Sequence, residues 1–294
     1  MNAQAGSAAA MAGDRIDASS PAARMRGIGG RGRAEAALRL TAACWLGIAV
    51  LGQLLFATYV TGFYGRAALQ GKPEIWNQVL AHGYVVGDTF LNLVLALHLL
   101  FAVVVIVGGA VQLLPQIRRK APALHRWNGR AYLILAGSVS IGGLSMVWIR
   151  GTVGDLSQHI AVSLNAVLIL GFAVVAWRHA RARRFELHRR WALRLFLAVS
   201  GVWFFRVGLM FWIVVNQGPV GFDPKSFTGP FLTFLSFAQF AVPLAVLELY
   251  FRVQQGRDPR AQLAMATGLG ILSLMMTVGI AAAAAIMWLP HLQS

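Results

Sequence analysis

The chain alternates long apolar stretches with short polar segments, a pattern that predicts a protein crossing a membrane several times. Seven apolar stretches are long enough for a hydrocarbon core that takes about 20 helical residues to cross. They lack the period-two alternation of a transmembrane β-strand, and a helix satisfies its own backbone hydrogen bonds in lipid. The predicted spans lie near residues 37–62, 85–114, 127–149, 157–178, 191–215, 230–251 and 262–289.

The predicted fold is therefore all-α, an integral membrane helical bundle of seven transmembrane helices over residues 36–294. Residues 1–35 are rich in Ala, Gly, Ser and Arg without apolar periodicity, which predicts a disordered basic arm. Segments 63–84 and 216–230 are the longer outer loops. The remaining connections are short, so successive helices are expected to pack as antiparallel neighbours. The Gly and Pro residues within the spans do not clearly indicate broken helices.

Charge and composition orient the bundle. Hydrophobic residues make up 57% of the chain and charged residues only 12%, as expected of a membrane protein. Most Lys and Arg residues fall in the arm and in segments 118–130, 178–194 and 252–260. The positive-inside rule then places the N-terminus in the cytoplasm, in the cytoplasmic (inner) membrane of a bacterium. Contact with anionic lipid explains the net charge of +16, so we expect no nucleic-acid partner.

Four of the seven histidines form the most informative polar pattern. His98 lies in the second span, His125 starts the third, His159 lies about one turn into the fourth, and His188 starts the fifth. The histidines of the first hairpin are 27 residues apart and those of the second are 29 apart. This spacing predicts one histidine pair towards each membrane face, the arrangement needed to hold two haems. Cys44 is the only cysteine, so redox chemistry would need a cofactor with other ligands.

The segments around the inner histidines repeat. His125-Arg126-Trp127-x-x-Arg130 opens the third span, and His188-Arg189-Arg190-Trp191-x-x-Arg194 opens the fifth, with one extra arginine. Helices two and three therefore look like a copy of helices four and five. This repeat predicts a four-helix core of helices two to five, with helices one, six and seven around it.

Each candidate residue also has a simpler role. His98 would be a neutral histidine bonded to a neighbouring helix, and His159 an interfacial polar residue. His125 and His188 would contact lipid phosphate. Arg126, Arg130, Arg189 and Arg194 would pair either with haem propionates or with phosphates.

Three further expectations concern charged and amide side chains within the spans. Arg206 needs a partner, for which the sequence offers an outer haem propionate, Asp88 or Asp155. Glu248 is expected to pair with Arg252 four residues later. Asn92, Asn165 and Gln112 are expected to bridge helices.

At His125-Arg126-Trp127-x-Gly129-Arg130-x-Tyr132 and at the segment from His188, the chain resembles DUF2306, a bacterial multi-pass membrane family. The resemblance covers roughly helices two to five and implies no particular activity. The four-histidine layout is also similar to that of the cytochrome b561 group. That resemblance implies haem pairs of His98 with His159 and of His125 with His188. The chain departs from the group because its inner histidines sit at helix starts.

We therefore expect a b-type electron carrier with one or two bis-histidine haem b groups, and quinol or a small reductant as donor. The alternative is a cofactor-free multi-pass protein, such as a transporter, sensor or assembly factor, with structural or protonatable histidines. Whether the protein is an enzyme stays open. The sequence contains no H-E-x-x-H, phosphate loop or nucleophile elbow.

Overall fold

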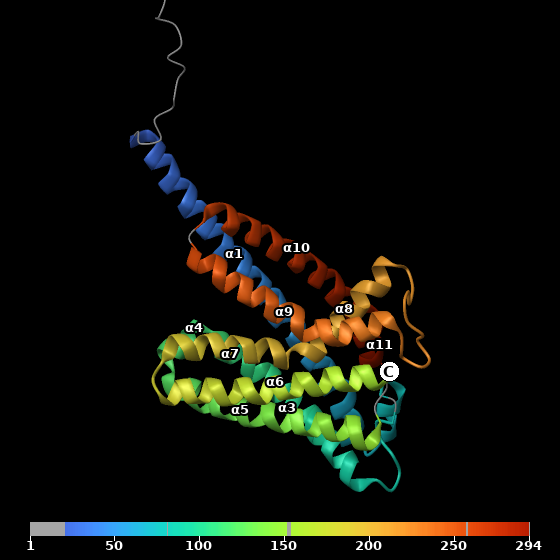
Figure 1. The fold of residues 1–294 in the computed structure, drawn as a ribbon. Helices are drawn as coiled ribbons and strands as arrows, with labels where there is room; N and C mark the ends of the chain where they lie inside the picture. Colours follow the sequence, from blue (N-terminus) through green and yellow to red (C-terminus); the bar gives the residue numbers. More distant parts are fainter. Residues whose placement is uncertain (1–20, 81, 152–153, 257, 294) are drawn as a thin grey trace, which may run out of the picture.

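The computed structural model describes residues 21–80, 82–151, 154–256 and 258–293, and the fold is helical throughout them (Figure 1). The first half contains α1 (Pro21–Val60), η1 (Thr61–Gly65), α2 (Arg66–Leu69), η2 (Pro73–Gln78), α3 (Thr89–Leu113), α4 (Pro115–Lys120), α5 (Pro122–Ser145) and η3 (Met146–Arg150). The second half contains α6 (Leu156–Arg181), α7 (Phe185–Val199), α8 (Gly201–Val215), α9 (Pro230–Gly256), α10 (Pro259–Ala283), η4 (Ala284–Trp288) and α11 (Leu289–Gln293).

Six described helices are long and apolar enough to cross a membrane, or seven spans if the bent pair α7–α8 counts as one. Across these described ranges the β-structure is limited to an isolated bridge between Asp223 and Thr228. The prediction of an all-α, multi-pass membrane bundle is confirmed, and its apolar outer surface contacts the lipid bilayer.

Two predicted boundaries differ from the structure. Residues 21–35 of the expected disordered arm are the helical start of α1, whereas residues 1–20 lie outside the described residues. The predicted fifth span is not one helix, because α7 and α8 meet at 51°. The bend falls on Ser200 and Gly201, and Gly/Ser pairs are a common place for sharp helix kinks.

The bend divides the bundle into two groups of helices (Figure 1). In one group α3 packs on α5, α5 on α6 and α6 on α7. In the other, α8 packs on α9 and α10, and α10 packs along α1. The predicted four-helix core therefore exists, but only the first half of the predicted fifth helix belongs to it. We call the end with α4 and the α6–α7 turn the basic end.

Small residues permit close helix approach, as the sequence suggested. A Cβ on Gly109 would lie 3.2 Å from Tyr132 of α5 and 3.5 Å from Phe196 of α7. A Cβ on Gly108 would meet Asn128, whose side-chain amide donates to the Gly108 carbonyl at 2.8 Å. In the other group, a Cβ on Gly279 of α10 would overlap the backbone carbonyl oxygen of Val207 in α8.

Gly279→Ala tests this contact, because the added methyl group has no space between α8 and α10. We expect it to destabilise the protein by about 1–3 kcal/mol, the usual cost of overpacking. Gly270→Ala is the matched control in the same helix, where no atom lies within 4 Å of the added Cβ. It should be neutral or stabilising, because Ala favours a helix over Gly by about 1 kcal/mol. The measurement is the thermal unfolding midpoint in detergent, and equal midpoints for the two variants would contradict the packing.

Arg150 closes the end of the four-helix group opposite the basic end. Its guanidinium donates to the Gly83 carbonyl at 2.8 Å, to Asp88 at 3.0 Å and to Asn92 at 2.9 Å. The Asp88 carboxylate also accepts the Leu91 backbone N–H at the start of α3. These bonds join the end of η3 to the loop that precedes α3.

The guanidinium of Arg150, and then the Leu91 N–H, hold the pKa of the Asp88 carboxyl below its ordinary value. A carboxyl with a lowered folded-state pKa contributes stability at neutral pH, which is lost as pH falls from about 4 through that lower pKa. Asp88→Asn should therefore lower the unfolding midpoint at neutral pH and reduce its fall on acidification.

Glu74→Gln on the same loop is the control, because no described residue forms an ion pair with Glu74. The measurement is the unfolding midpoint against pH. Parallel pH curves for the wild type and Asp88→Asn would show that the Arg150 contact makes no such contribution.

Candidate functional site

The helices that carry the four histidines form a closed ring. The packing order is α3, α5, α6 and α7, and Gly109 of α3 faces Phe196 of α7 to complete it. The helices of His98 and His159, α3 and α6, thus lie on one diagonal. The helices of His125 and His188, α5 and α7, lie on the other.

His98 lies against a glycine pair of α5. A Cβ on Gly142 would be 3.6 Å from His98 Nδ1, and one on Gly143 would be 3.5 Å from Cε1 of the same ring. The Nδ1 atom is buried and has no hydrogen-bond partner in the described part of the chain. The absence of side chains at Gly142 and Gly143 therefore leaves space for this imidazole, a use that the sequence did not indicate.

His159 also faces the end of α5. Its ring makes an edge-to-face contact with Trp148 of η3 at a centroid distance of 5.8 Å. The Trp148 indole N–H donates to Ser163 Oγ at 2.9 Å, and Ser163 donates to the His159 carbonyl at 2.8 Å. His98 and His159 thus approach the same half of α5 from its two neighbours in the ring, α3 and α6.

His125 and His188 both lie at the basic end, close enough for their charges to interact. His188 Nδ1 lies 3.0 Å from the carbonyl of Ala176 in α6. A proton on Nδ1 would make this contact a hydrogen bond and leave the Nε2 lone pair available. His125 Nδ1 is buried without a hydrogen-bond partner in the described ranges.

An apolar layer separates the two histidine levels. It consists of buried side chains from all four helices of the ring: Val105, Tyr132, Ala136, Ile169, Leu195 and Ala198. Phe172 and Val199 pack against them. This layer lies between the level of His125 and His188 and the level of His98 and His159.

The arginines of the repeated segments have different surroundings. Arg126 and Arg130 are exposed at the basic end, and the Arg130 guanidinium lies 4.8 Å from the Trp127 ring centre. Arg189 is exposed and lines a crevice beside α7. Arg194 donates to Glu248 at 2.7 Å. The predicted Glu248–Arg252 pair is therefore wrong, because a tertiary partner on α7 takes the carboxylate.

The expected helix bridges are present for all three residues. Gln112 of α3 donates to the His125 carbonyl of α5 at 2.8 Å, and Asn165 of α6 donates to the Ala198 carbonyl of α7 at 3.1 Å. Asn92 of α3 accepts from Arg150 of η3 at 2.9 Å, and it also donates to the Val85 carbonyl in the loop before α3 at 2.8 Å.

Arg206 projects from α8 without a carboxylate partner in the described chain. Asp88 is bound to Arg150, and Asp155 caps α6, so neither predicted acid pairs with it. The guanidinium lies 5.3 Å from the Phe56 ring centre and donates to the Val202 carbonyl at 3.2 Å. It also lies within electrostatic range of Tyr59, Tyr64 and His98.

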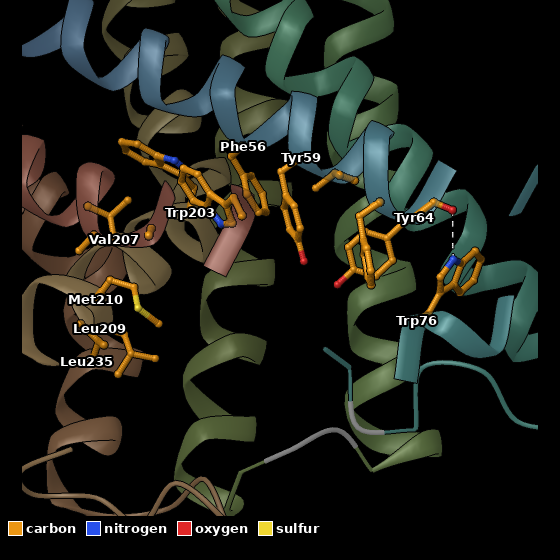
Figure 2. Close-up of a cluster of buried hydrophobic side chains, with 14 of the residues drawn as sticks. Phe56, Tyr59, Tyr64, Trp76, Trp203, Val207, Leu209, Met210 and Leu235 are labelled. Carbon is orange, nitrogen blue, oxygen red and sulfur yellow. Dashed lines mark hydrogen bonds between the residues drawn. The ribbon is translucent and has the colours of Figure 1, made fainter. Parts of the chain in front are cut away.

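Sequence reasoning missed the aromatic surroundings of Arg206. Phe56, Tyr59 and Tyr64 extend along α1 and η1, and their rings form one row (Figure 2). Trp288 packs on Phe56 at a centroid distance of 5.4 Å. Phe56, Tyr59 and Tyr64 are far from Trp288 in the sequence. The spacing of the aromatic residues on α1 is also typical of an ordinary buried helix face, so it did not indicate a site.

Among the described residues, no group of three or more His, Cys, Asp or Glu side chains could hold a metal ion. A haem iron takes only its axial ligands from the protein, so two histidines are sufficient.

Residues 95–225 match the family described as "Predicted membrane protein (DUF2306)". The DUF2306 match runs from α3 to the loop after α8, so it includes the four histidines, the α7–α8 bend and Arg206. Helices α1, α9 and α10 lie outside it. Neither the curated proteins nor the solved structures contain a significant match to the chain.

Proposed function

We propose that this protein is a b-type cytochrome of the bacterial cytoplasmic membrane that transfers electrons across or along the membrane. His98 and His159 would hold one haem b, and His125 and His188 the other. The observation that carries this function is the ring of four helices, with two histidines on each diagonal and an apolar layer between the two levels.

The outer level offers groups that suit a haem. The His98 imidazole lies on the Gly142–Gly143 surface, where an α-helix with larger side chains would displace it. Arg206 supplies a positive charge near His98 that no described carboxylate neutralises. An unpaired arginine inside a membrane is costly, and a propionate would compensate it by a charge-assisted hydrogen bond.

The inner level offers the ligand orientation of a metal-bound histidine. The contact of His188 Nδ1 with the Ala176 carbonyl fixes the tautomer in which Nε2 carries the lone pair. Arg126 and Arg130 provide cations at the adjacent membrane surface for propionates, whereas Arg189 lines the crevice on α7. The inner level is shallow, because both histidines lie in the first turn of their helices.

Bound haem would supply one-electron redox chemistry, while the chain provides orientation and environment. The histidine ligands and the low-dielectric layer of Val105, Ile169 and Leu195 would set the reduction potential of each site. The positive-inside orientation places His98 and His159 towards the periplasm. A quinol or a small periplasmic reductant would then be the electron donor.

A transporter without a cofactor is the second candidate, and one observation favours it. The α7–α8 bend lies inside the bundle beside three buried amide side chains, Gln53, Asn165 and Gln239. Gln53 donates to Ser200 at the bend, and a Cβ on Gly201 would lie 3.6 Å from Gln239 Oε1. Discontinuous helices with polar side chains are typical of transporter binding sites.

Visible absorption of the purified protein, with and without dithionite, separates the two candidates. Protein from cells supplied with haem precursor should show low-spin haem with two haems per chain. His98→Ala combined with His159→Ala should reduce the haem content to about half, because only one of two bis-histidine sites is lost. His188→Ala alone should remove the other haem and also leave about half of the wild-type haem content.

His179→Ala is the matched control, since His179 lies in the last turn of α6 and belongs to neither pair. It should keep the full haem content. A colourless wild type, or full haem content in the double variant, would reject the cytochrome and leave the transporter.

A further inference from the structure

A crevice of about 560 Å³ lies between the two helix groups, with α7 on one side and α1, α8, α9 and α10 on the other. Figure 1 shows α1 and α9 diverging from α7 towards the basic end. The volume is within the range of about 300–1,000 Å³ that is usual for ligand sites. The crevice belongs to neither histidine level.

The wall of the crevice is apolar over most of its length. On α9 it extends from Phe234 to Tyr250, 16 residues, or about 24 Å at the helical rise. One leaflet accounts for about 15 Å of the hydrocarbon core, so a whole acyl chain fits along this wall. Gln239, a buried amide in the lining, donates to the Ser236 carbonyl of its own helix at 2.8 Å.

Two arginines line the basic end of the crevice, Arg39 on α1 and Arg189 on α7. Leu38, next to Arg39, and Tyr250 belong to one packed cluster, and Arg190, next to Arg189, lies 4.7 Å from the Phe251 ring centre. Both arginines are therefore at the Tyr250 end of the apolar wall. Arg39 contacts Glu35 at 3.2 Å, but both side chains are more than half exposed, so this pair is weak. Arg189 has no ion-pair partner in the described segments.

We propose that the crevice binds an anionic phospholipid, with its phosphate between Arg39 and Arg189 and one acyl chain along α9. The two cations match a phosphate at the membrane surface, and the apolar wall matches the chain below it. Basic pockets between transmembrane helices favour anionic headgroups for this reason. The lipid would join α7 of the four-helix ring to α1 of the other helix group.

Native mass spectrometry of the detergent-purified full chain tests the site. The probes are dioleoyl phosphatidylglycerol and, with the same chains and a zwitterionic head, dioleoyl phosphatidylcholine. We expect one tightly bound phosphatidylglycerol and much weaker phosphatidylcholine binding. Arg39→Gln with Arg189→Gln should weaken phosphatidylglycerol binding about 25-fold, because each surface arginine contributes about a five-fold factor.

Arg119→Gln with Arg260→Gln is the matched control, since both arginines are exposed at the basic end and neither lines the crevice. This control should keep wild-type lipid binding. A second pair of variants tests the part of the crevice that would hold the acyl chain. Ala43→Phe fills the crevice from an exposed position on α1 and should displace the lipid. Ala264→Phe, exposed on α10 outside the lining, should not.

Equal binding of the two lipids, or equal loss in the two arginine double variants, would overturn the proposal. So would retention of the lipid by Ala43→Phe. These outcomes do not depend on the haem proposal, because native mass spectrometry counts bound lipid molecules and does not measure haem absorption. Binding of neither lipid would also overturn it.

Discussion

The bend at Ser200 and Gly201 is the feature on which the arrangement of the bundle depends. A single straight helix would keep all of the fifth apolar stretch beside α6, whereas the 51° bend sends α8 towards α9 and α10. The bend is held by a chain of bonds in which Gln53 of α1 donates to Ser200 Oγ and Ser200 donates to the Phe196 carbonyl. In lipid these polar groups have no water to replace a lost partner, so the bonds fix the bend.

The same bend shapes both candidate sites. Because α7 stays in the four-helix ring, His188 and His125 come within interaction range. Because α8 leaves the ring, Arg206 lies beside Phe56 of α1 and within electrostatic range of His98. The divergence of the two helix groups also opens the crevice that Arg39 and Arg189 line.

Much of the fold follows from the sequence, since apolar runs of membrane length have few alternatives to helices. The repeated His-Arg-Trp segments correctly indicated the four-helix ring. The bend was not predictable, because a Gly–Ser neighbour pair alone does not specify one: Gly137 and Ser138 form such a pair within the continuous α5. The ion-pair partner of Glu248 was not predictable from the sequence either. Glu248 had a suitable arginine four residues away, yet binds Arg194, because only the packing of α7 on α9 brings that guanidinium within reach.

The pairing of α1 with α10 has a consequence for assembly of the chain. These helices share the most extensive contact of the second group, although α3 to α9 lie between them in the sequence. During synthesis, α1 therefore enters the membrane long before its main partner exists, while α3, α5, α6 and α7 follow one another and can pack as they emerge. The four-helix ring is thus built from contacts local in sequence, which form early, whereas the crevice is completed only after α10 has been made.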